Sequence, residues 1–491
     1  MQRNQLTAMW RTEIYFIFMI LLCVQSISTT QYATDTCHMS KALSDEIDSY
    51  APLVHKIINE TTQGSFKSIT WQDLATFVDK FGPRFAGTPV LEEAINYVLN
   101  ESTRLGFENV HGEPVTIPHW VRGSESATLL QPRQKDLSLL GLGYSVGTPA
   151  EGITADAVVV NSFAELKKRA SEIPGKIVVY NQKFVSYGET VEYRSSGATR
   201  AAEFGAVAVL IRSVTPFSLY TPHTGMMSYG ANVTKIPAAC ITVEDATMLR
   251  RMANRGETIR INLKMEAKLL PNVQSRNVIV DIRGYSSPEK TVVVSGHIDS
   301  WDVGQGAMDD GGGIFISWTA LKLLKHLGLR ARRTIRTIMW TVEELGMIGA
   351  RQYIQKHEAE NENLQFVMES DIGTFNPVGL DFTGNKMVQC VLQRVMRLLD
   401  PLGDMKLRSP CQGPDIEYWV NAGVPGGSLW NQNEKYFYYH HTNADTMLAE
   451  NPKALDMNTA IFAAVSFVLA DISVDLPRHN YTREMSLNEV N

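Results

Sequence analysis

The spacing of apolar residues divides the chain into three parts, of which the first is predicted to be helical. Residues 38–115 have a helical spacing, and an amphipathic stretch starts at Leu91–Tyr97 and continues toward Leu105. A turn-rich loop, Gly82–Pro89, precedes that stretch. We therefore expect the N-terminal part of the fold to consist of helices.

The second part, from about residue 120 to 268, is predicted to be a module dominated by strands. Short runs of β-branched residues alternate with turn residues, and one helical pattern covers Arg200–Phe204. The expected strands are Ala157–Val160, Ile177–Tyr180, Val207–Ile211 and Ala239–Thr242.

From about residue 272, strands and helices are predicted to alternate. The expected strands are Val278–Ile282, Thr291–Ser295, Ile335–Val342 and Leu364–Glu369, and the expected helices are Ile314–Leu327 and Leu345–His357. This alternation predicts an α/β fold with a mostly parallel sheet covered by helices on both faces.

The N-terminus has the pattern of a secretory signal peptide. Two basic residues, Arg3 and Arg11, precede an apolar run at Ile14–Val24. The small residues Ser26 and Ser28 follow this run, and the pattern predicts a signal peptide of residues 1–28. The run is shorter than the roughly 20 residues of a transmembrane helix, although a short membrane anchor is the alternative. We expect a protein without a membrane span that is secreted or held in the lumen of the ER, Golgi or lysosome.

Glycosylation and cysteine patterns bear on the same compartment. Acceptor triplets begin at Asn59, Asn100, Asn232 and Asn480. Cys390 and Cys411 flank one predicted helix and its loop and are a candidate disulfide pair, with unpaired thiols as the alternative.

Length and charge limit the classes of function. The 491 residues correspond to two to four domains at roughly 100–200 residues each. The 46 basic and 52 acidic residues give a net charge of −6, which argues against nucleic acid as the main partner.

Acidic and histidine side chains recur directly after the predicted strands of the last 200 residues. Ligands bind at this carboxyl edge in open α/β sheets. One of the residues, Asp309, lies in a glycine-rich loop, where backbone can approach an ion closely. The residues at these five places are His297 with Asp299, Asp309, Glu343 with Glu344, Asp371, and His440 with His441.

Electrostatics predicts a metal centre if these edges meet. Four carboxylates, those of Asp309, Glu343, Glu344 and Asp371, would repel one another without a counter-charge, and two divalent cations would neutralise them. Carboxylates with imidazoles and no thiolate favour zinc, manganese or cobalt. An acidic pair taken alone is more typical of a solvated surface, and a histidine pair taken alone is more typical of a structural role, so the prediction depends on their occurrence together.

Several motifs resemble the co-catalytic zinc exopeptidases over most of the chain. They are Arg84–Thr88, Lys235–Thr242, Ser295–Gly313, Val424–Gly426 and Asp445–Met447. The resemblance implies a zinc exopeptidase fold, in which helices flank a mostly parallel mixed sheet and a β-rich protease-associated domain is inserted.

The resemblance also implies a role for each candidate site residue and two Zn²⁺ ions per subunit. Asp309 would bridge the two ions, and Glu343 would act as general base beside them. His440 stands where many relatives have a tyrosine, and we hypothesise that it donates a hydrogen bond to the oxyanion, packing alone being the alternative. The remaining ligands would be His297 with Asp371 on one ion and Glu344 with His441 on the other, while Asp299 would orient His297.

The domain boundaries that follow from pattern and resemblance cover the whole chain. They are a signal peptide at 1–28, a propeptide and N-terminal helical segment at 29–65, a first peptidase part at 66–120, a protease-associated insert at 121–268, a second peptidase part with the metal site at 269–478, and a tail at 479–491.

The implied function is that of a secreted di-zinc exopeptidase, synthesised as a precursor and active as a homodimer. It would hydrolyse dipeptides or short peptides with free termini through a hydroxide held between the metals. Arg84 and Asp415 lie in loop-like stretches and are candidates for reading the peptide termini. The alternatives are an aminopeptidase on longer peptides, a glutaminyl cyclase-like acyltransferase, and a receptor-like protein without activity.

Overall fold

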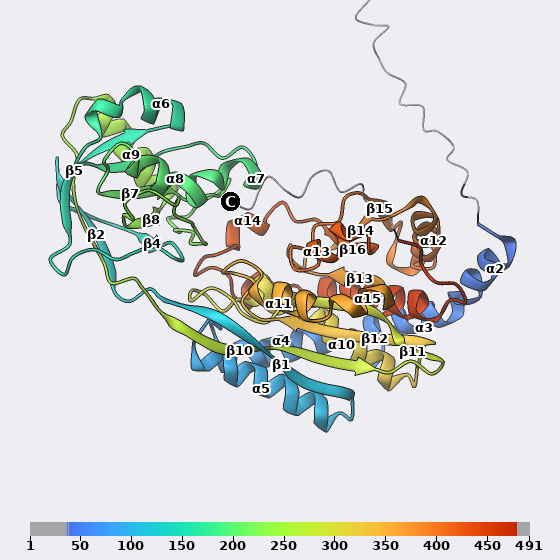
Figure 1. Cartoon of the computed structure of the whole chain (residues 1–491). Coiled ribbons are helices and arrows are strands. Elements are labelled where there is room, and N and C mark those ends of the chain that lie inside the picture. The colour runs from blue at the N-terminus through green and yellow to red at the C-terminus, as the bar shows by residue number, and fades with distance from the viewer. Residues whose placement is uncertain (1–36, 38, 479–491) are drawn as a thin grey trace, which may run out of the picture. The chain divides into compact units, whose positions relative to one another are not determined.

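The computed structural model describes residues 37 and 39–478 (Figure 1). The predicted signal peptide, the predicted tail and the sequon at Asn480 lie outside these residues.

The N-terminal part is helical, as predicted, up to Arg104. Two of its helices begin at side-chain caps: the Ser40 hydroxyl accepts a hydrogen bond from the Leu43 amide, and Pro89 opens a helix capped by Thr88. The helices are α2 (Lys41–Ser49), α3 (Ala51–Thr62), α4 (Ile69–Phe81) and α5 (Pro89–Arg104).

The helical prediction is wrong for residues 108–115, which belong to strand β1 (Glu108–Val121). Val115 and Ile117 are buried while the residue between them is exposed, so the apolar positions alternate with the period of a strand. β1 pairs with β10 (Lys268–Ile282) along most of its length, and this long-range pairing outweighs the local helical pattern.

One of the two sheets in the described residues is a mixed sheet of eight strands. Its strand order is β1-β10-β12-β11-β13-β16-β14-β15, with parallel pairing from β12 through β11 and β13 to β16. The predicted strand Leu364–Glu369 is confirmed as β13 without any shift. The other strands are β11 (Ser287–His297), β12 (Arg333–Trp340), β14 (Pro377–Thr383), β15 (Lys406–Arg408) and β16 (Gly426–Asn431).

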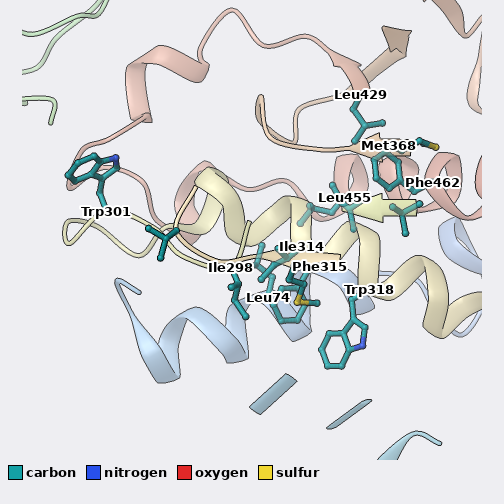
Figure 2. Close-up of a cluster of buried hydrophobic side chains, with 14 of the residues drawn as sticks. Leu74, Ile298, Trp301, Ile314, Phe315, Trp318, Met368, Leu429, Leu455 and Phe462 are labelled. Atoms are coloured by element: carbon teal, nitrogen blue, oxygen red, sulfur yellow. The ribbon is translucent and has the colours of Figure 1, made fainter. Parts of the chain in front are cut away.

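Helices cover both faces of this sheet, in agreement with the predicted α/β architecture. Neighbouring residues of β10 and β11 point to opposite faces: Val292 and Val294 join one buried cluster, and Val293 joins another. The first cluster is filled by α4, α10 (Gly312–His326) and α15 (Pro452–Asp471), and Figure 2 shows side chains of these helices packed together. The second is filled by α11 (Ile348–Lys356) and α13 (Glu417–Asn421).

Helix α15 is long and apolar enough to cross a membrane, and it is the one such helix in the described residues. Within its most apolar window, 89% of the residues are buried in the protein. The helix therefore serves as a core element, which explains an apolar run that the sequence analysis did not single out.

A second sheet lies in the chain between β1 and β10, and some of its buried side chains, such as Val158, form a separate cluster, whereas others, such as Val159 and Leu210, belong to the main cluster. Its strand order is β3-β2-β9-β5-β6-β7-β8-β4. All four strands predicted here are present, with shifts of at most a few residues at their ends. The bounds are β2 (Glu125–Gln131), β3 (Lys135–Leu137), β4 (Leu139–Gly141), β5 (Ile153–Val160), β6 (Ile177–Tyr180), β7 (Ala208–Arg212), β8 (Ala238–Ile241) and β9 (Arg260–Met265).

This segment contains more helix than predicted. The helix expected at Arg200–Phe204 overlaps the last three residues of α8 (Glu192–Ala202) and extends two residues beyond it. The buried face of α8 includes Gly197, Ala198 and Ala201, and such small residues leave a weak periodic signal in the sequence. The other helices are α6 (Phe163–Lys168), α7 (Tyr187–Thr190) and α9 (Val243–Asn254).

The predicted disulfide pair Cys390–Cys411 is wrong. Cys390, in α12 (Lys386–Arg397), is disulfide-bonded, whereas Cys411 is a free thiol. The Cys411 amide donates to Thr383 of β14, so this loop lies along the sheet. Flanking one helix in sequence does not bring two Cα atoms to the roughly 4.4–6.8 Å that a disulfide requires.

Candidate metal centre

The carboxyl ends of three neighbouring parallel strands bring predicted site residues to one edge of the sheet. His297 is the last residue of β11, which lies between β12 and β13. Glu343 and Glu344 follow β12, and Asp371 follows β13. Because parallel strands end at the same edge, residues far apart in sequence meet: His297 Nε2 lies 3.1 Å from Asp371 Oδ1.

Asp309 belongs to both of two groups of side-chain atoms that could hold a metal ion. Donor atoms of His297, Asp309 and Asp371 lie within 4.8 Å of one another, and so do donor atoms of Asp309, His440 and His441. The side chain of Glu344 completes the second group, with Oε2 3.0 Å from His441 Nε2. The structure thus brings together all five of the predicted metal ligands.

The loop that carries Asp309, η2 (Ala307–Gly311), is held by Asp445. One carboxylate oxygen of Asp445 accepts hydrogen bonds from the amides of Ala307 and Met308, and the other accepts from the Asp309 amide at 3.1 Å. Asp445 belongs to a motif that the sequence analysis quoted, but its role as the anchor of this loop was not predicted.

Arg84 holds the other side of the same loop and does not line the cavity described below. Its guanidinium is fully buried and donates to the backbone carbonyls of Gly82, Ile298, Gln305 and Gly306. The other candidate reader of peptide termini, Asp415, is also fully buried outside the cavity. Neither residue therefore lines the cavity.

Asp299 connects His297 to the Glu343–Glu344 pair, through its backbone carbonyl on one side and its carboxylate on the other. Its carbonyl oxygen lies 3.1 Å from His297 Nδ1, which matches the expected orienting role for this residue. Its carboxylate accepts hydrogen bonds from the amides of Glu343, at 3.0 Å, and Glu344. The residue before them, Val342, has φ +59°, an uncommon conformation for a β-branched residue that recurs at functional sites.

Burial makes negative charge costly at this site. It raises the pKa of Glu343 to about 8 and the pKa of Glu344 well above its usual range. Burial also lowers the pKa of His441 to about 3, so its imidazole is neutral and able to bind a metal. Asp309 Oδ2 and Glu344 Oε1 are buried and accept no hydrogen bond from any described residue. Unsatisfied carboxylate oxygens beside neutral imidazoles fit a site built for cations.

Two further residues support the ligands and were not assigned by sequence. The Asp310 carboxylate accepts from the amides of His297, at 2.9 Å, and Gly313. The Tyr436 hydroxyl donates to the Asp371 carbonyl at 3.2 Å. The Asp-Asp pair and the aromatic run were visible as signals, but the partners of these side chains depend on the folded loops.

A cavity of about 710 Å³ opens onto these residues. Its floor includes Asp309, Glu343 and Asp371, and His440 lies beside them, stacked on His441 with ring centroids 3.5 Å apart. One part of the wall comes from helices α7 and α8 of the segment between β1 and β10, and another part from residues 410–421. The site therefore has room for a small ligand next to the metal-ligating groups.

Comparison with known proteins agrees with this geometry. The model of the family "Peptidase family M28" matches residues 277–466. Carboxypeptidase Q of Homo sapiens is 51% identical over 436 residues, which covers 89% of this chain and 92% of the human protein. Carboxypeptidase Q of Mus musculus is 48% identical, with 95% and 99% covered.

A solved structure supports the same relationship. The crystal structure of a peptidase M28 precursor from Shewanella amazonensis superimposes with a TM-score of 0.84 at 33% identity, covering 89% of this chain and all of the bacterial chain. The chain therefore belongs to peptidase family M28, together with the carboxypeptidase Q enzymes to which it is similar over most of its length.

Proposed function

We propose that this protein is a zinc-dependent exopeptidase that hydrolyses dipeptides or short peptides with free termini. The observation that carries the proposal is the convergence of four imidazole and carboxylate side chains on Asp309 at the cavity, which together make the five proposed ligands. Membership of the M28 peptidase family and similarity to carboxypeptidase Q support peptide hydrolysis as the reaction.

The residues present fit two zinc ions that share Asp309. His297 and Asp371 would complete one site, and Glu344 and His441 the other. Asp309 offers both oxygens: Oδ1 lies 3.3 Å from His297 and Oδ2 lies 3.3 Å from His441. Two dications would balance the four carboxylates of the site, and burial otherwise raises the pKa of three of them, Glu343, Glu344 and Asp371, toward the protonated form. Bound zinc supplies Lewis acidity, which activates water and polarises a peptide carbonyl.

Glu343 is the general base in this proposal. Its side chain lines the cavity, and its amide is held by Asp299, so the carboxylate is placed beside the ligands without being one of them. A Glu343 oxygen takes a proton from the attacking water and later donates that proton to the leaving amine nitrogen. Nearby cations would keep its carboxylate ionised and ready to accept the proton.

His440 is the proposed hydrogen-bond donor to the developing oxyanion. It lines the cavity, and burial lowers its pKa well below the usual range, so the imidazole is neutral with a single N–H. Its Nε2 lies 3.7 Å from Asp309 Oδ2. A neutral donor at this place would stabilise negative charge on the substrate carbonyl as the water attacks.

The segment between β1 and β10 is the proposed protease-associated insert, and it contributes one wall of the cavity. The proposed propeptide needs a revised boundary. Val54 and Ile57 of α3 are fully buried in the main core, so removal of the whole segment 29–65 would expose that core. We therefore place the trimming before Lys41.

The secretory pathway is the proposed destination. Asn59, Asn100 and Asn232 are all exposed, as glycosylation requires, and a disulfide bond involves Cys390. Homodimer formation stays a prediction of the resemblance, and light scattering on purified protein would decide it.

Glu343→Gln tests the proposed function most directly. The variant keeps the shape of the side chain but cannot accept the proton, so kcat for a dipeptide should fall by about 10²- to 10⁴-fold. Zinc content, measured by mass spectrometry, should equal that of the wild type. The matched control is Glu358→Gln, which changes an exposed glutamate outside the cavity and should leave kcat unchanged. Wild-type turnover by Glu343→Gln would refute the assignment.

A further inference from the structure

Arg194 is a buried cation in the wall of the cavity without an acidic partner among the described residues. It belongs to α8, and its exposed fraction is 6%. Its guanidinium donates to the Tyr187 hydroxyl at 2.8 Å and to the Thr224 carbonyl at 3.4 Å. Its Nε is buried and has no hydrogen-bond partner within the described chain.

Burying the Arg194 charge in this way costs free energy as long as no ligand is bound. Arginine stays protonated in proteins, and buried charges are normally paired with an opposite charge. Here the two partners are neutral, and one N–H group is left unsatisfied. A ligand that brings a negative charge into the cavity would remove this cost, and a carboxylate matches the planar guanidinium best.

The guanidinium also lies close to the metal centre. The Thr224 carbonyl that accepts from Arg194 lies 3.2 Å from Nδ1 of His441, so one oxygen contacts both side chains. On the other side, the Tyr187 ring packs edge-on against His440 with centroids 5.2 Å apart. Any group bound to Arg194 is therefore a near neighbour of the proposed zinc ligands.

The backbone next to Arg194 is shaped around the guanidinium. A Cβ atom built on Gly225 would lie 2.3 Å from Arg194 Cζ, much closer than non-bonded atoms approach. Gly225 also has φ +142°, which a residue with a side chain rarely adopts. The close approach of this glycine holds the guanidinium in place, which is the preorganisation that a binding group needs.

We infer that Arg194 binds the free C-terminal carboxylate of the peptide substrate, an inference that rests on the proposed function. An extended peptide spans about 3.5 Å per residue, so a carboxylate on Arg194 lies only a residue or two from the bond that is cut. The preferred substrates are then dipeptides and other short peptides with a free C-terminus near the scissile bond. Peptides blocked at that end as amides are disfavoured.

The experiment compares one dipeptide as the free acid and as its C-terminal amide, with zinc-loaded wild type and Arg194→Ala. The wild type should prefer the acid. The substitution should lower kcat/KM for the acid by about 10- to 100-fold, mainly through KM, and should change kcat/KM for the amide by less than about threefold. Arg194→Lys should recover part of the preference, because it keeps the charge without the planar donor pair.

A binding measurement gives a readout that does not need turnover. In a Glu343→Gln background, calorimetry should show tighter binding of the acid than of the amide, and Arg194→Ala should abolish the difference. The matched control is Arg212→Ala. Arg212 belongs to the same segment and also has a buried Nε without a hydrogen-bond partner in the described residues, but it does not line the cavity. This control should keep the wild-type preference.

Two outcomes would overturn the inference while leaving the proposed function intact. One is hydrolysis of acid and amide with equal kcat/KM by the wild type. The other is an equal loss on both substrates in Arg194→Ala, which would indicate a structural role. Absence of zinc-dependent hydrolysis of either substrate by the wild type would instead refute the proposed function, and the inference with it.

Discussion

Asp309 is the residue on which both groups of metal-ligating atoms depend. Its two oxygens face different histidines, and its amide is held by Asp445. Residue type and position after a strand were sufficient to propose Asp309 and its partners from the sequence. Residue type and position were not sufficient to tell which of two buried arginines faces the cavity. The guanidinium of Arg84 donates to backbone carbonyls, while Arg194 lines the cavity. Which acceptors surround a guanidinium is decided by folded loops.

At this scale, His440→Ala tests the proposed oxyanion donor. Removing one such donor typically costs about 10²- to 10³-fold in kcat, and we expect a loss of that size with unchanged zinc content. The control is His111→Ala, which changes an exposed histidine that does not line the cavity. Loss of zinc together with activity would show that His440 is a ligand, and an unchanged kcat would show that it only packs.

At the scale of elements, the position of α10 against the strand ends sets the geometry of the site. Gly313, in the first turn of α10, approaches the residue after β13 so closely that a Cβ there would lie 1.9 Å from the Ser370 carbonyl oxygen and 2.2 Å from Asp310 Oδ1. A glycine at this position lets the helix start directly beside the loop that carries Asp371. The glycine run was a visible signal, and the sequence analysis related it to a close approach, although of an ion rather than of a strand end.

Gly313→Ala should therefore push α10 away from Ser370. We expect the free energy of unfolding to fall by about 1–3 kcal/mol, because overpacked backbone must shift, together with weaker zinc binding. Thermal unfolding and zinc titration would measure the two effects. Gly188→Ala is the matched control, since a Cβ on this exposed glycine meets nothing within 4 Å. Wild-type stability and zinc affinity in Gly313→Ala would contradict this account.

At the scale of the whole molecule, the cavity is built from parts of the chain that are distant in sequence. Tyr187 and Arg194 come from the segment between β1 and β10, and Asp309, Glu343 and His440 come from the part after it. The backbone of His441 is tied to that segment as well, because the Thr224 amide donates a hydrogen bond to the His441 carbonyl. Both parts of the fold therefore contribute to the cavity.

Metal removal should destabilise the whole fold. A ligand that binds only the folded state adds about 2.7 kcal/mol at a free concentration of 100 times its Kd, so the midpoint of thermal unfolding should rise with zinc and fall after chelation. Scanning fluorimetry across a zinc series measures this. In His441→Ala, which removes one proposed ligand, the response should be smaller. A midpoint independent of zinc would contradict the proposed centre.

The sequence by itself determined the class of the fold, the strand-and-helix order after residue 272 and the residue types gathered at the strand ends, because these follow from local periodicity and from the chemistry of side chains. Only the tertiary structure decided that residues 108–115 form a strand, that Cys411 is a free thiol, and that Arg194 rather than Arg84 faces the cavity. Each of these depends on a partner far along the chain, and the distance between such partners is set by packing rather than by local pattern.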